Sequence, residues 1–290
     1  MKNAAAPDQI LHGDAGGAAY TLLVYVPPAP LSDFVDRFWY CEHPNPAHRY
    51  ERVMPSGRMA LVVNLVEDRL SCRFGDRPPQ YSRGICIAGA YLQHAVLDTA
   101  EQRRIMGVHF KPGGMFPFLA PPAEAFTDTD VSLEDLWGAR AHSLHQQLID
   151  TPTPQAKFAI LERALLSYAA RPLKLHPAVA HALRELERVP AMRTISELAR
   201  ETRISPKRFI RLFREQVGYT PKYYCRVRRF QRVLRMIERS RTVEWAGIAV
   251  DCGYYDQAHF IRDFRAFSGW NPSAYLTVRG ERVQHIPLPG

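Results

Sequence analysis

The strongest constraint on the fold is a repeat in the last third of the chain. Residues 209–221 read FIRLFREQVGYTP and residues 260–272 read FIRDFRAFSGWNP, with seven identities at a constant offset of 51. Each copy follows a short apolar stretch, which contains Leu198-Ala199 in the first copy and Ile248-Ala249 in the second. Self-similarity at a fixed offset indicates one structural unit that is present twice. The repeat therefore predicts two copies of a helix, a tight turn and a second helix.

The second helix of each unit has strong signals at both of its ends. Ser205 and Asp256 are good N-cap residues, and Pro206 suits the first turn of a helix. Gly218 and Gly269 supply C-terminal stops. Between these ends, apolar residues at helical spacing predict a buried stripe beside a cationic face. The stripes are Phe209, Leu212, Phe213 and Val217 in the first unit, and Phe260, Phe264 and Phe267 in the second.

The segment between the two units, residues 221–239, predicts one long helix with an apolar face. Its roughly 19 residues rise about 1.5 Å each, so the helix spans about 28 Å. One turn of duplex DNA is about 34 Å long. A helix of this length could set two recognition helices into successive major grooves on one side of a duplex.

The charge of the chain is concentrated in the same region. Residues 1–170 carry 15 Lys and Arg against 18 Asp and Glu, a net charge of −3, whereas residues 171–290 carry 23 against 11, a net charge of +12. Such asymmetry favours a polyanionic partner. In a helix-turn-helix unit the second helix enters the major groove, where Arg and Lys contact guanine and Gln contacts adenine. Two such units in a basic domain therefore indicate double-stranded DNA as the partner.

At these residues the chain resembles the C-terminal DNA-binding domain of the AraC/XylS family of bacterial transcriptional regulators. The resemblance covers about residues 177–278, with a first helix at 177–189, and includes the motif IAVDCGYYDQAHFIRDFRAFSGWNP at 248–272. It implies an all-α domain of seven helices, in which a long linker helix joins two helix-turn-helix units. It also implies transcription regulation, usually activation through contact with RNA polymerase.

The same resemblance implies which residues contact DNA. The positions that face bases in the family are filled here by Lys207, Ile210, Arg211, Gln257, Ala258, Ile261 and Arg262. We expect direct base readout mainly from the polar members of this set. The three apolar members depart from the family pattern, and they either meet thymine methyl groups or contribute little. The candidates for phosphate contacts are Arg208, His259 and Arg265.

The first 170 residues predict a separate α+β domain, with a β-barrel-like arrangement as one option. Strand-like runs lie at 20–26, 60–66, 84–90 and 104–110, and an amphipathic helix is expected around 31–39. A helix is also expected to begin after a Ser132 cap, another at 115–119, and a longer one at 154–170. The chain as a whole is thus expected to be multidomain, with residues 1–170 preceding a DNA-binding domain at 171–290.

By pattern the first domain resembles the sensor-like domain of many AraC-type regulators. The motifs PSG at 55–57 and FKPGG at 110–114 resemble an uncharacterised variety of it. The resemblance implies binding of an unknown small-molecule effector and formation of a homodimer. The helix at 154–170 has a stripe that forms either a dimer seam or intradomain core. Its members are Phe158, Leu161, Leu165 and Leu166.

Other features argue against several classes of function. Asp8 and Asp14 interrupt the apolar character of the N-terminus, and no apolar run reaches the roughly 18 residues of a membrane span, so we expect a cytoplasmic protein without membrane contact. The five cysteines are odd in number and widely spaced, so we expect reduced thiols. The histidines lack metal-binding spacing, and no catalytic or nucleotide-binding motif occurs. We therefore expect no enzyme activity, no metal and no cofactor.

Two alternatives remain open at this point. The first is a DNA-binding module fused to an enzyme, such as an alkyl-damage repair protein, which needs a cysteine-rich zinc or alkyl-acceptor site. The scattered Cys41, Cys72 and Cys86 speak against that alternative. The second is an interaction protein whose basic helices dock an acidic protein. DNA affinity that falls steeply with salt but shows no sequence preference would favour the second alternative.

Overall fold

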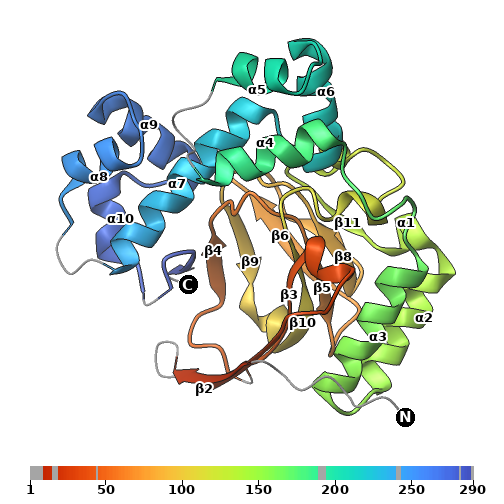
Figure 1. The fold of residues 1–290 in the computed structure, drawn as a ribbon. Coiled ribbons are helices and arrows are strands. Elements are labelled where there is room, and N and C mark those ends of the chain that lie inside the picture. Colours follow the sequence, from red (N-terminus) through yellow and green to blue (C-terminus); the bar gives the residue numbers. More distant parts are fainter. Residues whose placement is uncertain are drawn as a thin grey trace.

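The N-terminal part of the molecule is built on two β-sheets, and the C-terminal part is a group of helices (Figure 1). The computed structural model describes residues 9–14, 19–43, 45–188, 194–239, 243–280 and 282–288. A β-rich domain followed by a helical region confirms the expected fold class. Within the described ranges, no helix is both long enough and apolar enough to cross a membrane.

Both sheets are antiparallel throughout. The larger sheet has the strand order β1 (Gln9–Asp14), β2 (Ala19–Tyr25), β3 (Val35–Glu42), β10 (Arg104–Phe110), β5 (Ala60–Asn64), β8 (Ile85–Ala88) and β11 (Asp130–Ser132). The smaller sheet has the order β12 (His285–Leu288), β4 (Tyr50–Val53), β9 (Ala95–Asp98), β6 (Leu70–Phe74) and β7 (Gln80–Ser82). The four strand-like runs of the sequence correspond to β2, β5, β8 and β10.

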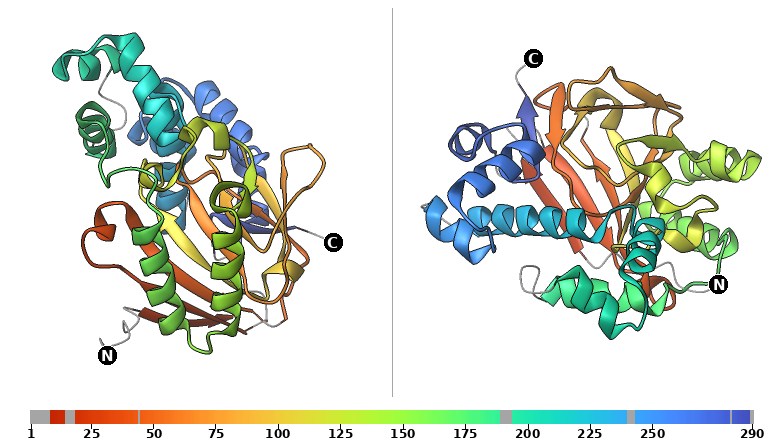
Figure 2. Two further views of the ribbon diagram at one scale, coloured as in Figure 1. Left: turned by 90° about the vertical axis from the view of Figure 1, so that its right-hand side faces the viewer. Right: turned by 90° about the horizontal axis from the view of Figure 1, so that it is seen from above.

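A helical pair packs against the larger sheet. The pair consists of α2 (Ala139–Asp150) and α3 (Pro154–Ser167), and it follows the short α1 (Glu134–Trp137) (Figures 1 and 2). The Phe158 ring stacks on Tyr25 of β2, with ring centroids 5.9 Å apart. Phe158, Leu161 and Leu165 are at most 1% exposed, whereas Leu166 is 43% exposed. Three of the four residues considered for a dimer seam therefore belong to the core of this domain.

The expected helix at 31–39 is wrong. The segment forms a single 3-10 turn, η1 (Leu31–Asp33), and then the strand β3. Leu31, Val35 and Phe38 have helical spacing and are all fully buried, which is why the pattern suggested a helix. The strand prevails because β3 lies inside the sheet and forms its ladder with β2 on one side and β10 on the other.

Two other expected helix starts are also corrected. Ser132 is the last residue of β11, and its hydroxyl accepts a hydrogen bond from the Arg83 backbone N–H at 2.9 Å. The hydroxyl is therefore engaged elsewhere, and α1 begins at Glu134 without a side-chain cap. In place of a helix at 115–119 there is only the 3-10 turn η3 (Phe116–Phe118), which contains Pro117.

The seven expected helices of the C-terminal region are present. They are α4 (Pro177–Arg188), α5 (Ile195–Glu201), α6 (Pro206–Val217), α7 (Pro221–Arg239), α8 (Trp245–Asp251), α9 (Gln257–Ser268) and α10 (Pro272–Val278). The long helix α7 runs between the group of α5 and α6 and the group of α8, α9 and α10 (Figure 1). Its bounds agree with the sequence prediction.

Helix α7 and the turn before it are bonded to the N-terminal domain. The buried Gln231 donates from Nε2 to the Pro55 carbonyl at 2.7 Å, and its Oε1 accepts from Gln284 at 3.0 Å. The Tyr219 hydroxyl donates to the Tyr91 carbonyl at 2.8 Å, and Tyr223 donates to the next carbonyl of the same loop. The linker helix is therefore an interior element of the molecule.

The N-terminal domain also contacts the turn that follows α6 and the turn that follows α9. Thr127 Oγ1 donates to the Gly218 carbonyl at 3.3 Å after α6. Arg52 Nη1 donates at 3.0 Å to the carbonyl of Ser268, the last residue of α9, and the Arg52 guanidinium lies 3.8 Å from the centroid of the Trp270 ring in the turn that follows. Gly218 and Gly269 are equivalent positions of the repeat. The N-terminal domain therefore contacts the two helix-turn-helix units at corresponding positions, near the C-terminal ends of α6 and α9.

The last described strand returns from the helical region to the N-terminal domain. β12 pairs with β4 in the smaller sheet, and His285 Nδ1 lies 3.0 Å from a carboxylate oxygen of Glu51. Burial of the Glu51 side chain opposes ionisation, but His285 beside it holds the pKa of the carboxyl below its ordinary value. The chain therefore crosses between the two parts of the molecule twice.

Substitution of Gln231 tests the bond between α7 and the N-terminal domain. Gln231→Leu keeps the side-chain size but leaves the buried Pro55 carbonyl without its donor, so we expect a loss of about 1–3 kcal/mol in the free energy of unfolding. The measurement is urea unfolding followed by circular dichroism. Arg232→Leu, at the exposed neighbouring position, is the control and should shift stability by no more than about 0.5 kcal/mol. Equal effects of the two substitutions would contradict this role of Gln231.

A second prediction concerns pH and the contact around Gly269. An added Cβ at Gly269 would lie 2.5 Å from Arg52 Nη1 and 2.8 Å from His94 Cε1. Both side chains are therefore packed closely against this glycine. Burial, together with the positive charge of Arg52, lowers the pKa of His94 to about 4.

In the unfolded chain a histidine takes up a proton near pH 6.5, whereas in the folded protein His94 stays neutral down to about pH 4. Between these two pH values the unfolded state binds more protons than the folded state. The folded protein therefore has its full stability above pH 6.5 and loses stability as the pH falls toward 4. We expect the free energy of unfolding to fall by up to about 2 kcal/mol between pH 7 and pH 5 from this residue. Urea unfolding at the two pH values measures the change. His94→Gln should reduce the slope, and an identical slope in this variant would refute the assignment.

Candidate nucleic-acid interface

Capping interactions fix the start and the end of both α6 and α9. The Ser205 hydroxyl accepts from the Arg208 backbone N–H at 3.3 Å, and the Asp256 carboxylate accepts from the His259 backbone N–H at 2.6 Å. Each helix ends at a left-handed glycine, Gly218 with φ of +84° and Gly269 with φ of +79°. All four cap residues therefore act as the sequence predicted.

The turn that precedes each of these helices also needs a left-handed residue. Arg203 has a φ of +55° and Gly253 has a φ of +77°, and the two positions are 50 residues apart. The Ile204 N–H donates to the Ala199 carbonyl at 3.3 Å, and the Tyr254 N–H donates to the Ala249 carbonyl at 3.0 Å. The two turns therefore share one geometry, although only the second has the glycine that suits it.

The inner faces of α6 and α9 are buried, and their outer faces are exposed. Phe209, Phe213, Phe260, Phe264 and Phe267 are all 0% exposed. This burial orients each helix and turns its other side to solvent. On α6 the exposed predicted residues are Lys207, Arg208, Ile210 and Arg211. On α9 they are Gln257, Ala258, Ile261, Arg262 and Arg265.

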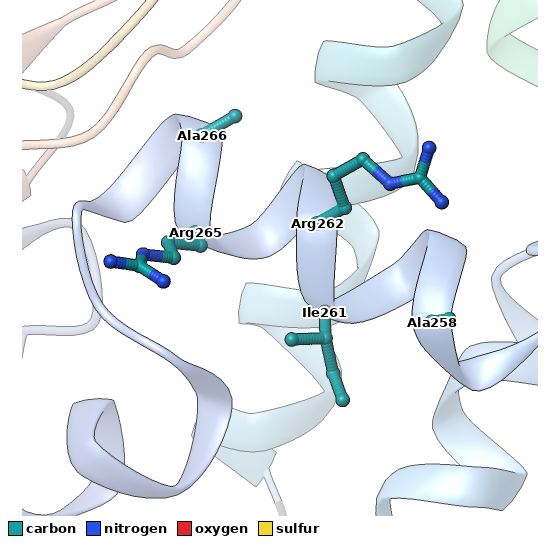
Figure 3. Close-up of a pocket in the computed structure, with 5 residues that line it drawn as sticks. All are labelled: Ala258, Ile261, Arg262, Arg265 and Ala266. Carbon is teal, nitrogen blue, oxygen red and sulfur yellow. The ribbon is translucent and has the colours of Figure 1, made fainter.

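The exposed face of α9 contains an open hollow (Figure 3). Ala258, Ile261, Arg262, Arg265 and Ala266 line it. The two guanidinium groups point away from each other, on either side of the apolar residues (Figure 3). No ion pair within the described ranges engages Lys207, Arg208, Arg211, Arg262 or Arg265, so these charges are available to a partner.

Two other basic residues of these helices are engaged inside the molecule. His259 is half-buried, with Nε2 3.7 Å from an Asp263 carboxylate oxygen and its ring edge-on to Tyr254. Arg214 forms an ion pair with Glu124 of the N-terminal domain at 2.5 Å. His259 therefore differs from the other predicted contact residues in having partners of its own.

Sequence analysis missed a buried ionic cluster that joins α9 to α7. Asp263 is 3% exposed, and its Oδ1 accepts from Arg226 Nη2 at 2.8 Å and from Arg226 Nε at 3.1 Å. Burial lowers the pKa of the Arg226 guanidinium, but hydrogen bonds to Asp263 raise the pKa above its ordinary value. Asp263 is the residue of the second unit that is equivalent to Leu212 in the first unit. An acidic residue at a position of the apolar stripe was the sequence signal that could have revealed the cluster.

Two exposed apolar residues beside the second turn were also missed. Val250 at the end of α8 is 73% exposed, and Tyr255, directly before the Asp256 cap, is 92% exposed. Both residues lie close in sequence to the first turn of α9. Nothing in the sequence distinguishes them from core residues, because their neighbours Ala249 and Tyr254 are buried.

The fold and the exposed faces of α6 and α9 define the class of protein, which is a DNA-binding protein with two helix-turn-helix units. Residues 198–277 match the family described as "Helix-turn-helix domain", of the AraC type. Residues 23–132 match the family described as "Domain of unknown function (DUF6597)". The chain thus carries an AraC-type helix-turn-helix domain behind an uncharacterised N-terminal domain, and the resemblance to AraC-type transcription regulators is confirmed.

Individual proteins are also similar to parts of this chain. The chain is 27% identical over 116 residues to an uncharacterized HTH-type transcriptional regulator of Haemophilus influenzae; the match covers 40% of this chain and 37% of that protein. The chain therefore spans little more than a third of this relative.

Two solved structures are also similar. The C-terminal domain of AraT, a response regulator from Geobacillus stearothermophilus, has 20% identity and a TM-score of 0.34, over 37% of this chain and 88% of that chain. ToxT from Vibrio cholerae has 9% identity and a TM-score of 0.44, over 79% and 94% of the two chains.

Substitution of Asp263 tests the ionic cluster. Asp263→Asn leaves Arg226 without its counter-charge, so we expect the free energy of unfolding to fall by about 2–3 kcal/mol. The expected loss is smaller than for a fully buried pair because the Arg226 side chain is partly exposed. The double variant Asp263→Leu with Arg226→Leu replaces the pair by apolar side chains and should recover at least half of that loss. Urea unfolding measures both. Unchanged stability in Asp263→Asn would contradict the assigned role.

Proposed function

We propose that the chain is a transcription regulator that binds double-stranded DNA sequence-specifically and reads two successive major grooves with α6 and α9. The observation that carries the proposal is the repeated exposure of the same helix face. In both units the N-terminal half of the second helix is capped, exposed and backed by a fully buried aromatic stripe. In helix-turn-helix proteins this half of the second helix contacts base edges.

The proposal assigns a role to each exposed polar residue. Lys207 and Arg211 on α6 and Arg262 on α9 contact guanine, and Gln257 contacts adenine, because these pairings match the donor and acceptor patterns in the major groove. Arg208 and Arg265, free of internal ion pairs in the described ranges, contact phosphates. His259 is the weaker phosphate candidate, since it already faces Asp263.

The charge distribution supports a nucleic-acid partner. Residues 171–290 carry a net charge of +12, and several of the cations lie on the exposed faces of α6 and α9. Lys and Arg contacts to phosphates release counter-ions, so affinity should fall with rising salt. Under this proposal the N-terminal domain, up to about residue 170, regulates the DNA-binding domain formed by residues 171–290.

The resemblance extends the proposal to further partners. AraC-type regulators usually activate transcription by contacting RNA polymerase in the cytoplasm, and we propose the same activity and location here. An effector bound by the N-terminal domain and a homodimer belong to the same proposal. The homodimer needs a surface other than the stripe of α3, because Phe158, Leu161 and Leu165 are buried within the domain.

The thiols speak against the enzymatic alternative. An alkyl acceptor reacts as a thiolate, and a raised pKa lowers the thiolate fraction. Burial raises the pKa of Cys41, Cys72 and Cys86 alike. Within the described ranges no three His, Cys, Asp or Glu side chains are placed to hold a metal ion. Zinc content of the purified protein is an inexpensive check on this alternative.

The test of the proposal is selection of random duplex DNA by the full-length protein at physiological salt, followed by binding measurements on the recovered sequence. Lys207→Ala and Arg262→Ala should each reduce the discrimination between the selected duplex and random DNA by about 1–3 kcal/mol. Fluorescence anisotropy titrations measure both affinities. Arg140→Ala, which removes an exposed arginine of α2, is the matched control and should leave discrimination unchanged.

Three results decide between the hypotheses. Loss of discrimination in both variants, each at its own half of the site, supports base readout by α6 and α9, and unchanged discrimination in one variant refutes the base contact of that residue. Unchanged discrimination in both variants would refute the base contacts. Selection without any enriched sequence, together with salt-dependent binding to random duplexes, would favour the interaction-protein alternative.

A further inference from the structure

The two recognition helices carry different chemistry at corresponding positions. At the repeat offset of 51, the exposed isoleucine and arginine of α6, Ile210 and Arg211, recur on α9 as Ile261 and Arg262. At three other positions a charged residue of α6 is replaced on α9 by a smaller or less charged residue. These pairs are Lys207 and Ala258, Arg208 and His259, and Glu215 and Ala266. The exposed isoleucine of α9 therefore stands among small apolar residues, whereas that of α6 stands among charged ones.

The hollow on α9 lies at two of these changed positions, Ala258 and Ala266. Ala258, Ile261 and Ala266 form its apolar lining, and Ile261 is 38% exposed. Arg262 and Arg265 flank the lining with guanidinium groups that point away from each other (Figure 3). A duplex complements this arrangement, because Arg265 can contact an anionic phosphate and Arg262 a guanine edge while the apolar lining faces the groove floor. The second helix thus offers apolar contact where the first offers Lys207.

The apolar groups that the major groove displays are the C5-methyl groups of thymine. Ala258 lies in the first turn of α9, and residues near the helix N-terminus are those that reach base edges. Ile261 follows three residues later on the same face. Gln257, one residue before Ala258, suits adenine, the base that pairs with thymine. All three side chains therefore favour the same kind of base pair.

We infer that α9 reads thymine–adenine base pairs through methyl contacts made by Ala258 and Ile261. The operator then has two chemically different halves. The half read by α6 contains guanines contacted by Lys207 and Arg211, and the half read by α9 contains, beside the guanine contacted by Arg262, thymines whose methyl groups enter the hollow. This inference rests on the proposed function, because it requires that both helices enter the major groove.

The test uses the duplex recovered by the selection described above. Each thymine is replaced in turn by deoxyuridine, which lacks only the C5-methyl group. The half read by each helix is assigned from the bases at which Lys207→Ala and Arg262→Ala lose discrimination. We expect about a fourfold loss of affinity for each contacted methyl group that is removed in the half read by α9.

The wild-type protein is then compared with two matched variants. Ile261→Ala should weaken binding to the thymine duplex and should abolish the uracil effect at the thymine that Ile261 contacts, while the effect at a thymine contacted by Ala258 stays. Ile210→Ala, at the equivalent position of α6, should leave the uracil effect in the α9 half intact. Circular dichroism of each variant checks that the helical content is unchanged.

The outcomes separate this inference from the proposed function. If the protein selects a defined sequence and Lys207→Ala loses discrimination, but uracil has no effect in the α9 half, the methyl contacts are refuted and the regulator function stands. If the uracil effect at every thymine of the α9 half is as large in Ile261→Ala as in the wild type, the assignment to Ile261 is overturned. If no sequence is enriched, the proposed function fails, and the inference fails with it.

Discussion

The burial of α7 between three parts of the molecule is the constraint on which the rest of the structure depends. Phe230 contacts Phe264 and Phe267 of α9, with ring centroids 5.4 and 5.1 Å apart. Toward the first unit, Tyr224 contacts Phe213 of α6 at 5.6 Å. Gln231 and Tyr223 bond the same helix to the N-terminal domain. One helix therefore sets the separation of the two recognition helices, and its packing fixes both of them relative to the β-sheets.

The N-terminal domain adds a second set of constraints at the ends of the recognition helices. Its contacts to Gly218 and Ser268 lie at the C-terminal ends of α6 and α9. These contacts leave the exposed N-terminal halves of both helices uncovered. The N-terminal domain can thus position both helices without covering the surface that we propose to face DNA. Accordingly, among the residues that the structure describes, the cations near the helix starts form no ion pair, whereas Arg214 in the last turn of α6 is paired with Glu124.

Sequence analysis succeeds where local signals and burial agree. The caps at Ser205 and Asp256, the glycine stops and the bounds of α7 all follow from residue types at fixed spacing, and the exposed face follows from the aromatic stripe. It fails where long-range pairing decides. Residues 31–39 have a helical pattern, yet the strands on both sides of β3 determine its conformation. The pairing of β12 with β4 joins segments more than 200 residues apart, which no local pattern reveals.

The candidate site divides in the same way. The exposed basic residues were predictable, because the repeat and the apolar stripe fix the orientation of each helix. The ionic cluster of Asp263 with Arg226 was not, since it depends on how α9 packs on α7. The hollow on α9 was also not predictable, although its residues were, because only packing shows which of them share one open surface.

The spacing of the bound site tests the central claim most directly. The full-length protein is titrated with the selected duplex and with duplexes that carry one to five extra base pairs between the two halves. If α7 and the N-terminal domain hold α6 and α9 in a fixed relation, affinity should be highest with half-sites about 10 base pairs apart and should fall to that of a single half-site in the longer duplexes. Equal affinity for all spacings would contradict the account.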